Sequence, residues 1–410
     1  MQQISARRAK THNPHKAGAR ASDKSRKPAS REAGLGKPGK SVEQTEKRKA
    51  RRALHFAMKA KASDLLSEVL PAQSKALAGC GRWAIGPGVV TFTRKQTPSG
   101  PKASATGLQT CSAIWLCPDC SARIAAQRAA EVNGALQWAR AQGYAIHMLT
   151  LTMRHDRRDK LRPSLEALKA AMKSLRQSKR WRDMNLRGSI AATEITHSEA
   201  AGFHPHAHII LISDAPESEA CEAIEALRAE WLRSLKKAGR EGNGHAFHVQ
   251  NASEAGAYVA KMGAAAEITM AGQKAGRNGS QTPMELLAAA AEGCKRSASI
   301  WLEYAQAVHG VAALVWSRGL RETVESWLAE KPQAEAEGEG EAEGEEEILL
   351  QVHTGSLEWQ YAKRRMVAIL TAIESGGDIQ AALYGPSDAE IWRGVVSRTQ
   401  VIDDDDKGGP

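Results

Sequence analysis

Residues 189–214 read SIAATEITHSEAAGFHPHAHIILISD, and this stretch decides the fold. Its alternating side chains predict two strands joined by a turn near SEAAG. In the second strand, the period of two places His204, His206 and His208 on one face. Folding the hairpin about residue 200 puts Glu194 of the first strand opposite His206. The stretch therefore predicts a hairpin that brings imidazoles and a carboxylate together.

This set of side chains matches what a divalent cation needs. Two neutral imidazole nitrogens and one carboxylate suit Mg²⁺ or Mn²⁺, with coordination positions left open for a phosphate. The candidate ligands are imidazoles from among His204, His206 and His208, together with Glu194. The alternative is that these are hydrogen-bonded core histidines, which is the usual role of a single histidine on a strand.

The elements expected around the hairpin are a strand and two helices. AIHMLTLTMRH, residues 145–155, has the β-branched and apolar content of a strand buried on at least one side. Residues 121–143 and 163–181 carry apolar side chains every three to four positions, which predicts amphipathic helices.

Four of the six cysteines have the spacing of a metal site: Cys80, Cys111, Cys117 and Cys120. The last two belong to a CPxC knuckle, and four thiolates around Zn²⁺ form a closed structural site. GPGVVTFTR, which begins at residue 86, is able to form a hairpin that returns Cys111 to Cys80. The alternative is four unrelated buried cysteines.

Charge is distributed unevenly along the 410 residues, whose net charge is +11. Residues 1–60 carry 17 Lys and Arg against 4 Asp and Glu, which predicts a disordered basic arm suited to DNA phosphates. The Glu-rich stretch 330–347 is expected to be an acidic linker, and 348–410 a small helical tail with a disordered end. No apolar run is long enough for a membrane helix, so we expect a cytoplasmic protein that does not contact a membrane.

The segment NASEAGAYVAKMG, residues 251–263, predicts a short helix. Glu254, Tyr258 and Lys261 would share one face at positions i, i+4 and i+7. A tyrosine phenol can attack a phosphodiester when a metal polarises the phosphate, and Glu254 is placed to act as a base. A surface pair of Tyr and Glu is the alternative.

Three of these segments, in this order, resemble the motifs of the HUH endonuclease superfamily: the TLT strand, HPHAHIIL and the tyrosine helix AYVAKM. Within it, CSAIWLCPDC, the Glu-x-x-x-Tyr spacing and WLEYAQAVHG with ALVWSRGL resemble rolling-circle replication initiators of small bacterial plasmids. The resemblance covers roughly residues 75–325.

The resemblance implies a role for each residue of the helix. Tyr258 corresponds to the nucleophile that becomes linked to the 5′-phosphate at a nick, and Lys261 to the motif lysine. Glu254 corresponds to the glutamate that directs a water to end replication in initiators with one tyrosine. The implied partners are plasmid origin DNA and a host helicase and polymerase. A mobilisation relaxase or transposase, and a zinc-containing DNA-binding protein without enzymatic activity, are the alternatives.

The resemblance also implies metal ligands and a fold. His206 and His208 match the paired ligands, and His204 matches a residue beside them. Glu194 is the expected third ligand, with His155 as a competitor. The implied fold is α+β, a central antiparallel sheet with helices packed on it and a small zinc-binding segment. The expected division is a zinc segment with its helix over 61–143 and a nicking and joining domain over 144–329.

Overall fold

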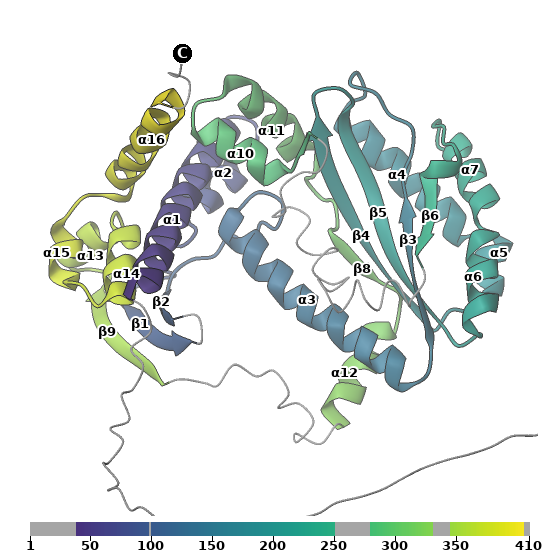
Figure 1. Cartoon of the computed structure of the whole chain (residues 1–410), viewed down its shortest axis with the longest axis horizontal. Helices are drawn as coiled ribbons and strands as arrows, with labels where there is room; N and C mark the ends of the chain where they lie inside the picture. The colour runs from purple at the N-terminus through teal and green to yellow at the C-terminus, as the bar shows by residue number, and fades with distance from the viewer. Residues whose placement is uncertain (1–37, 98–99, 251–278, 331–344, 406–410) are drawn as a thin grey trace, which may run out of the picture.

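The protein is mixed α+β, as expected, with two antiparallel sheets and helices packed on them (Figure 1). The computed structural model describes residues 38–97, 100–250, 279–330 and 345–405. Within these residues no helix is both long and apolar enough to cross a bilayer.

The larger sheet has six strands in the order β6-β3-β5-β4-β7, with β8 also paired to β4. Its strands are β3 (Ala145–Leu151), β4 (Gly188–Ser198), β5 (Gly202–Ser213), β6 (Phe247–Gln250), β7 (Ser280–Gln281) and β8 (Leu314–Trp316). Glu194 pairs with His206 across β4 and β5, which confirms the hairpin register expected from the sequence. Gly202 has φ +75° at the turn, and a Cβ there would lie 2.8 Å from the Arg157 backbone.

Helices cover both faces of this sheet. One face packs on α4, α6 and α7, and the other on α3 and α12. With the short α5, their bounds are α3 (Pro118–Ala141), α4 (Leu161–Arg176), α5 (Lys179–Asp183), α6 (Glu217–Glu225), α7 (Arg228–Lys237) and α12 (Leu320–Glu330). Odd-numbered Ile209 of β5 meets the α4 side, whereas even-numbered Ile210 meets the α3 side. His204, His206 and His208 have the parity of the α3 face.

The smaller sheet joins distant parts of the sequence. It has the order β2-β1-β9, formed by β1 (Val89–Thr97), β2 (Gly100–Thr106) and β9 (Glu346–His353). Four helices accompany it: α13 (Leu357–Ala362), α14 (Met366–Ser375), α15 (Ile379–Tyr384) and α16 (Asp388–Asp405). The expected helical tail thus contains helices but also supplies a strand to this sheet. Because β9 begins at Glu346, the expected acidic linker is wrong at its C-terminal end.

Helix α1 (Pro38–Leu66) corrects the expectation of a disordered arm through residue 60. Its small and apolar residues bury one face: Ala53, Ala57, Met58, Ala62 and Leu66. This face packs with α2 (Pro71–Gly79), α10 (Pro283–Ala291) and α11 (Lys295–Ala307). The packing stabilises a helix whose many positive charges suggested disorder. In Figure 1, α1 lies between the C-terminal helices α13, α14 and α15 on one side and α3 with the six-stranded sheet on the other.

Candidate metal centres

The first centre lies where β4 and β5 approach the end of their hairpin. Glu194 Oε2 is 3.2 Å from His206 Nε2 and 3.1 Å from His208 Nε2. The structure therefore brings together the three side chains that the sequence predicted as ligands. All three are largely shielded from solvent, with 10–18% of each side chain exposed.

These distances fit a shared cation. Two ligand atoms about 2.1 Å from one ion at a right angle lie about 3.0 Å apart. The other nitrogen of each imidazole also has a partner: His208 Nδ1 lies 3.0 Å from Thr150 Oγ1, and His206 Nδ1 lies 3.3 Å from the His204 carbonyl. If each Nδ1 carries the proton, each Nε2 offers its lone pair toward Glu194.

The environment keeps Glu194 anionic. Burial by itself would raise the pKa of this carboxyl. When His206 and His208 are protonated, their hydrogen bonds and positive charges lower the pKa well below its usual value, and a cation bound in place of those protons would supply the same positive charge. An ionised carboxylate beside two imidazoles is a ligand set that suits a hard divalent cation with open positions.

His204 and His155 lie beside this group but face different partners. Their rings stack with centroids 4.7 Å apart, and His204 Nε2 is 2.7 Å from Thr152 Oγ1. His155 Nδ1 lies 3.0 Å from the Ala201 carbonyl. Burial, and then the neighbouring His206, lower the pKa of His204 to about 4, so this ring is neutral near pH 7. The group of close ligand atoms contains Glu194 and not the competing His155.

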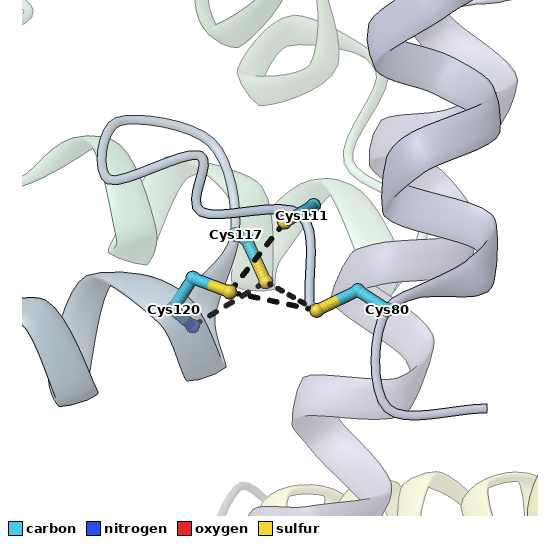
Figure 2. A group of neighbouring side chains, drawn as sticks. All are labelled: Cys80, Cys111, Cys117 and Cys120. Atoms are coloured by element: carbon cyan, nitrogen blue, oxygen red, sulfur yellow. Dashed lines mark hydrogen bonds between the residues drawn. The ribbon is translucent and has the colours of Figure 1, made fainter. Parts of the chain in front are cut away.

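The second centre contains the four predicted cysteines (Figure 2). Cys80 Sγ lies 3.7 Å from Cys117 Sγ and 3.5 Å from Cys120 Sγ, and Cys111 Sγ lies 3.6 Å from Cys120 Sγ. A tetrahedron of sulfurs about 2.3 Å from a central Zn²⁺ has edges of about 3.8 Å. All four are free thiols, so the spacing fits a metal better than disulfides.

The chain brings these cysteines together from three places. Cys80 follows α2, Cys111 follows the β1–β2 hairpin, and Cys117 and Cys120 form the N-terminal turn of α3. Backbone hydrogen bonds on both sides of the hairpin, such as Gly81 N–H to the Gln109 carbonyl at 2.8 Å, hold its base closed. The return of Cys111 to Cys80 is thus confirmed.

A charged network beside the cysteines was not predicted from the sequence. Lys59 of α1 donates to the Cys80 carbonyl at 3.0 Å and to Asp119, inside the CPxC knuckle, at 2.6 Å. His55 Nδ1 is 2.7 Å from the other oxygen of Asp119. Burial would lower the pKa of Lys59, but Asp119 and the nearby thiolates raise it, so a cation is held beside the cysteines.

Hydrogen bonds among the thiols favour ionisation of at least one of them. Those with Cys111 and then Cys117 lower the pKa of Cys80. Thiolate is the form that binds Zn²⁺. The residue types, the distances and the adjacent cation therefore all suit a soft metal ion.

Tyr258, Glu254 and Lys261 lie outside the described residues, so their predicted places stay predictions. The described chain ends at Gln250 in β6 and resumes at Gly279, just before β7. β6 pairs with β3, and β7 pairs with β4 close to the hairpin turn.

The chain matches known proteins over most of its length. Residues 105–367 match a family described as "Replication protein". "Protein rep" of Streptomyces lividans is 26% identical over 302 residues, covering 55% of this chain and 66% of that protein. A "Neomycin resistance protein" of Streptomyces cyanogenus is 32% identical over 139 residues, covering 27% of this chain and 32% of that protein. The chain thus spans two thirds or less of these relatives, and no solved structure matches it.

Proposed function

This chain belongs to the replication-protein family, and on that premise we propose that it initiates rolling-circle replication of a plasmid by nicking one DNA strand at the origin. The observation that carries the proposal is the group formed by Glu194, His206 and His208 inside the matched region. The same geometry supports membership of the HUH superfamily. The branch with one catalytic tyrosine is supported only by the sequence resemblance.

The metal group would bind the scissile phosphate. Glu194, His206 and His208 would hold Mg²⁺ or Mn²⁺, which supplies positive charge to the phosphate oxygens when bound. Thr150 and the His204 carbonyl keep the two ligand rings oriented through their Nδ1 atoms. The low pKa of Glu194 keeps its charge available over the neutral range.

Tyr258 would perform the cleavage. Its phenolic oxygen loses a proton and attacks the phosphorus, which forms a 5′-phosphotyrosine bond and releases the 3′-hydroxyl of the preceding nucleotide. Lys261 would balance the negative charge of the phosphate. Later, Glu254 would accept a proton from a water or a hydroxyl, so that the link is broken by hydrolysis or strand transfer without a second tyrosine. These three assignments rest on the sequence resemblance.

The remaining features support a DNA partner. The four cysteines would hold a structural Zn²⁺ that ties α2, the β1–β2 hairpin and α3 together. Net charge +11 favours binding to phosphates, with an affinity that falls steeply with salt. A host helicase and polymerase would act on the 3′-end that the nick exposes.

The experiment is cleavage of supercoiled plasmid that carries the parent origin, with Mn²⁺ or Mg²⁺ added. We expect nicked circles with covalently attached protein. Tyr258→Phe should retain DNA binding and lose both nicking and attachment, whereas His206→Ala should lose nicking through loss of the metal. Two matched controls, Tyr144→Phe and His353→Ala, remove a phenolic hydroxyl and an imidazole outside the proposed site.

The outcomes separate the competing functions. DNA binding without cleavage by the wild-type protein under all metal conditions would favour a zinc-containing DNA-binding protein. Full nicking by Tyr258→Phe would exclude this tyrosine as the nucleophile. Cleavage at a transfer origin rather than at the replication origin would favour the mobilisation relaxase.

A further inference from the structure

A cavity of about 510 Å³ lies in the C-terminal part of the protein. None of its lining residues belongs to either metal centre, and all of them come later in the sequence. α13, the link to α14 and the first turns of α16 form it, and they lie at the opposite side of α1 from the six-stranded sheet (Figure 1). Its polar lining is Tyr361, Arg364, Arg365, Ser387, Glu390 and Arg393 among others. Three arginines thus share the cavity with one carboxylate.

The single carboxylate is already engaged. Glu390 accepts hydrogen bonds from the Ser387 N–H at 2.7 Å and from the Ser387 hydroxyl at 2.6 Å, an arrangement that caps α16. The Arg364 side chain is exposed, and among the described residues it makes no hydrogen bond or ion pair. The cavity therefore presents positive charge without an internal counter-ion for Arg364.

A second arginine is held in place beside the ring of Tyr361. Arg365 donates from Nε to the Gly385 carbonyl at 2.6 Å, and its guanidinium lies 5.3 Å from the centre of the Tyr361 ring. Tyr361 in turn meets Tyr384 edge to face, with ring centroids 5.3 Å apart. Tyr384 does not line the cavity itself but contacts the lining residue Tyr361. It is 56% exposed, so much of its ring is open to a ligand beside the cavity.

The combination of features identifies the class of ligand. Arginine guanidiniums bind phosphate oxygens, and an exposed aromatic ring stacks on an unpaired base. The volume is within the range of pockets for molecules larger than a phosphate ion. A base in a duplex stays stacked between its neighbours, so an exposed tyrosine beside a concave site suits a single strand better.

We propose that this cavity, which we call the arginine pocket, binds single-stranded DNA, with a phosphate at Arg364 and a base at Tyr384. The site goes beyond the proposed nicking reaction, because none of its residues belongs to the metal groups. It gives the protein a second place to hold a displaced strand while the first site performs cleavage.

The test uses the full-length protein and a fluorescein-labelled oligothymidine of about 12 nucleotides, followed by anisotropy across a salt series. Arg364→Ala should weaken binding and reduce the slope of log affinity against log salt by about 0.7, the loss of one single-strand phosphate contact. Tyr384→Ala should weaken binding roughly tenfold or more. Arg318→Ala, which removes an exposed arginine near α12, is the matched control and should leave the slope unchanged.

A second readout locates the strand directly. Oligonucleotides that carry 5-iodouracil should crosslink to the peptide containing Tyr384 under ultraviolet light, in wild type and equally in Tyr258→Phe. The crosslink therefore tests strand binding independently of the nicking activity. The proposal would be overturned by unchanged affinity and salt slope in Arg364→Ala, or by the absence of a crosslink in this peptide. It would also be overturned if duplex DNA displaced the labelled oligothymidine better than single strands did, or if only an acidic peptide displaced it.

Discussion

Thr150→Val is expected to weaken binding of the divalent cation at the hairpin while leaving the three ligands in place. The Thr150 hydroxyl oxygen lies 3.0 Å from His208 Nδ1 and accepts a hydrogen bond from Nδ1–H when Nε2 faces a cation. Valine has nearly the same shape but offers no acceptor. The Nδ1–H would then lack this partner in a ring that is only 10% exposed.

The expected loss is 10–100-fold in metal affinity, which corresponds to about 1.4–2.7 kcal/mol. Thr152→Val is the matched control, because Thr152 is two residues further along the same segment and contacts His204 instead, at 2.7 Å. His204 is not among the three close ligands. Both changes remove one hydroxyl and add one methyl group, so only their imidazole partners differ.

The assay is titration with Mn²⁺ followed by electron paramagnetic resonance of the free ion, with the cysteine site already loaded with Zn²⁺. Wild type and Thr152→Val should bind with similar affinity, and Thr150→Val should bind more weakly. Equal affinities in all three proteins would refute the orienting role of Thr150. A larger loss in Thr152→Val would move the metal toward His204 and away from His208.

Three further changes test the surrounding structure. Glu374→Gln should lower the stability of α14 by about 3 kcal/mol, because this buried carboxylate accepts two hydrogen bonds from Arg52, at 2.8 and 2.6 Å. The control is Glu347→Gln, which removes the exposed ion pair with Arg94 and should cost under about 1 kcal/mol. Hydrogen exchange of α14 amides measures the first cost and that of β9 amides the second, and similar losses of protection would contradict the assignment. Burial raises the pKa of Asp388 to about 6, so stability should fall by up to about 3 kcal/mol as the pH rises from about 4 to about 6 and then level off. Asp388→Asn should flatten that profile in urea titrations, and an unchanged profile would assign the titration elsewhere. Lys59→Met should weaken Zn²⁺ retention against a chromophoric chelator about 10–100-fold, whereas equal retention would leave Lys59 with no role at the cysteines.

The hairpin is the part of the candidate site that was predictable from local pattern. Strand periodicity determines which residues share a face, and a short turn determines the register, so the pairing of Glu194 with His206 follows from positions in one segment. The CPxC knuckle is similarly local, because adjacent residues at a helix start direct two thiolates to one point. Such features depend on contacts between residues close in sequence.

The C-terminal strand and the first helix were not predictable in this way. β9 pairs with β1 across more than 250 residues, and Glu347 reaches Arg94 from the stretch expected to be a linker. Helix α1 carries dense positive charge, and its buried face is stabilised by packing against helices that follow it in sequence, among them α2, α10 and α11. The composition of these segments gives their charge, but it does not show which distant strands and helices they pack against.

The sequence by itself therefore determined the ligand chemistry: which histidines share a face, which carboxylate opposes them and which cysteines suit a soft metal. The tertiary structure alone decided which groups support those ligands, such as Thr150 behind His208 and Lys59 beside Cys80. The physical reason is that side-chain periodicity is set by the backbone geometry of one strand or of two strands adjacent in sequence. A supporting hydrogen bond depends instead on how helices and strands from distant positions pack, and no local pattern encodes that packing.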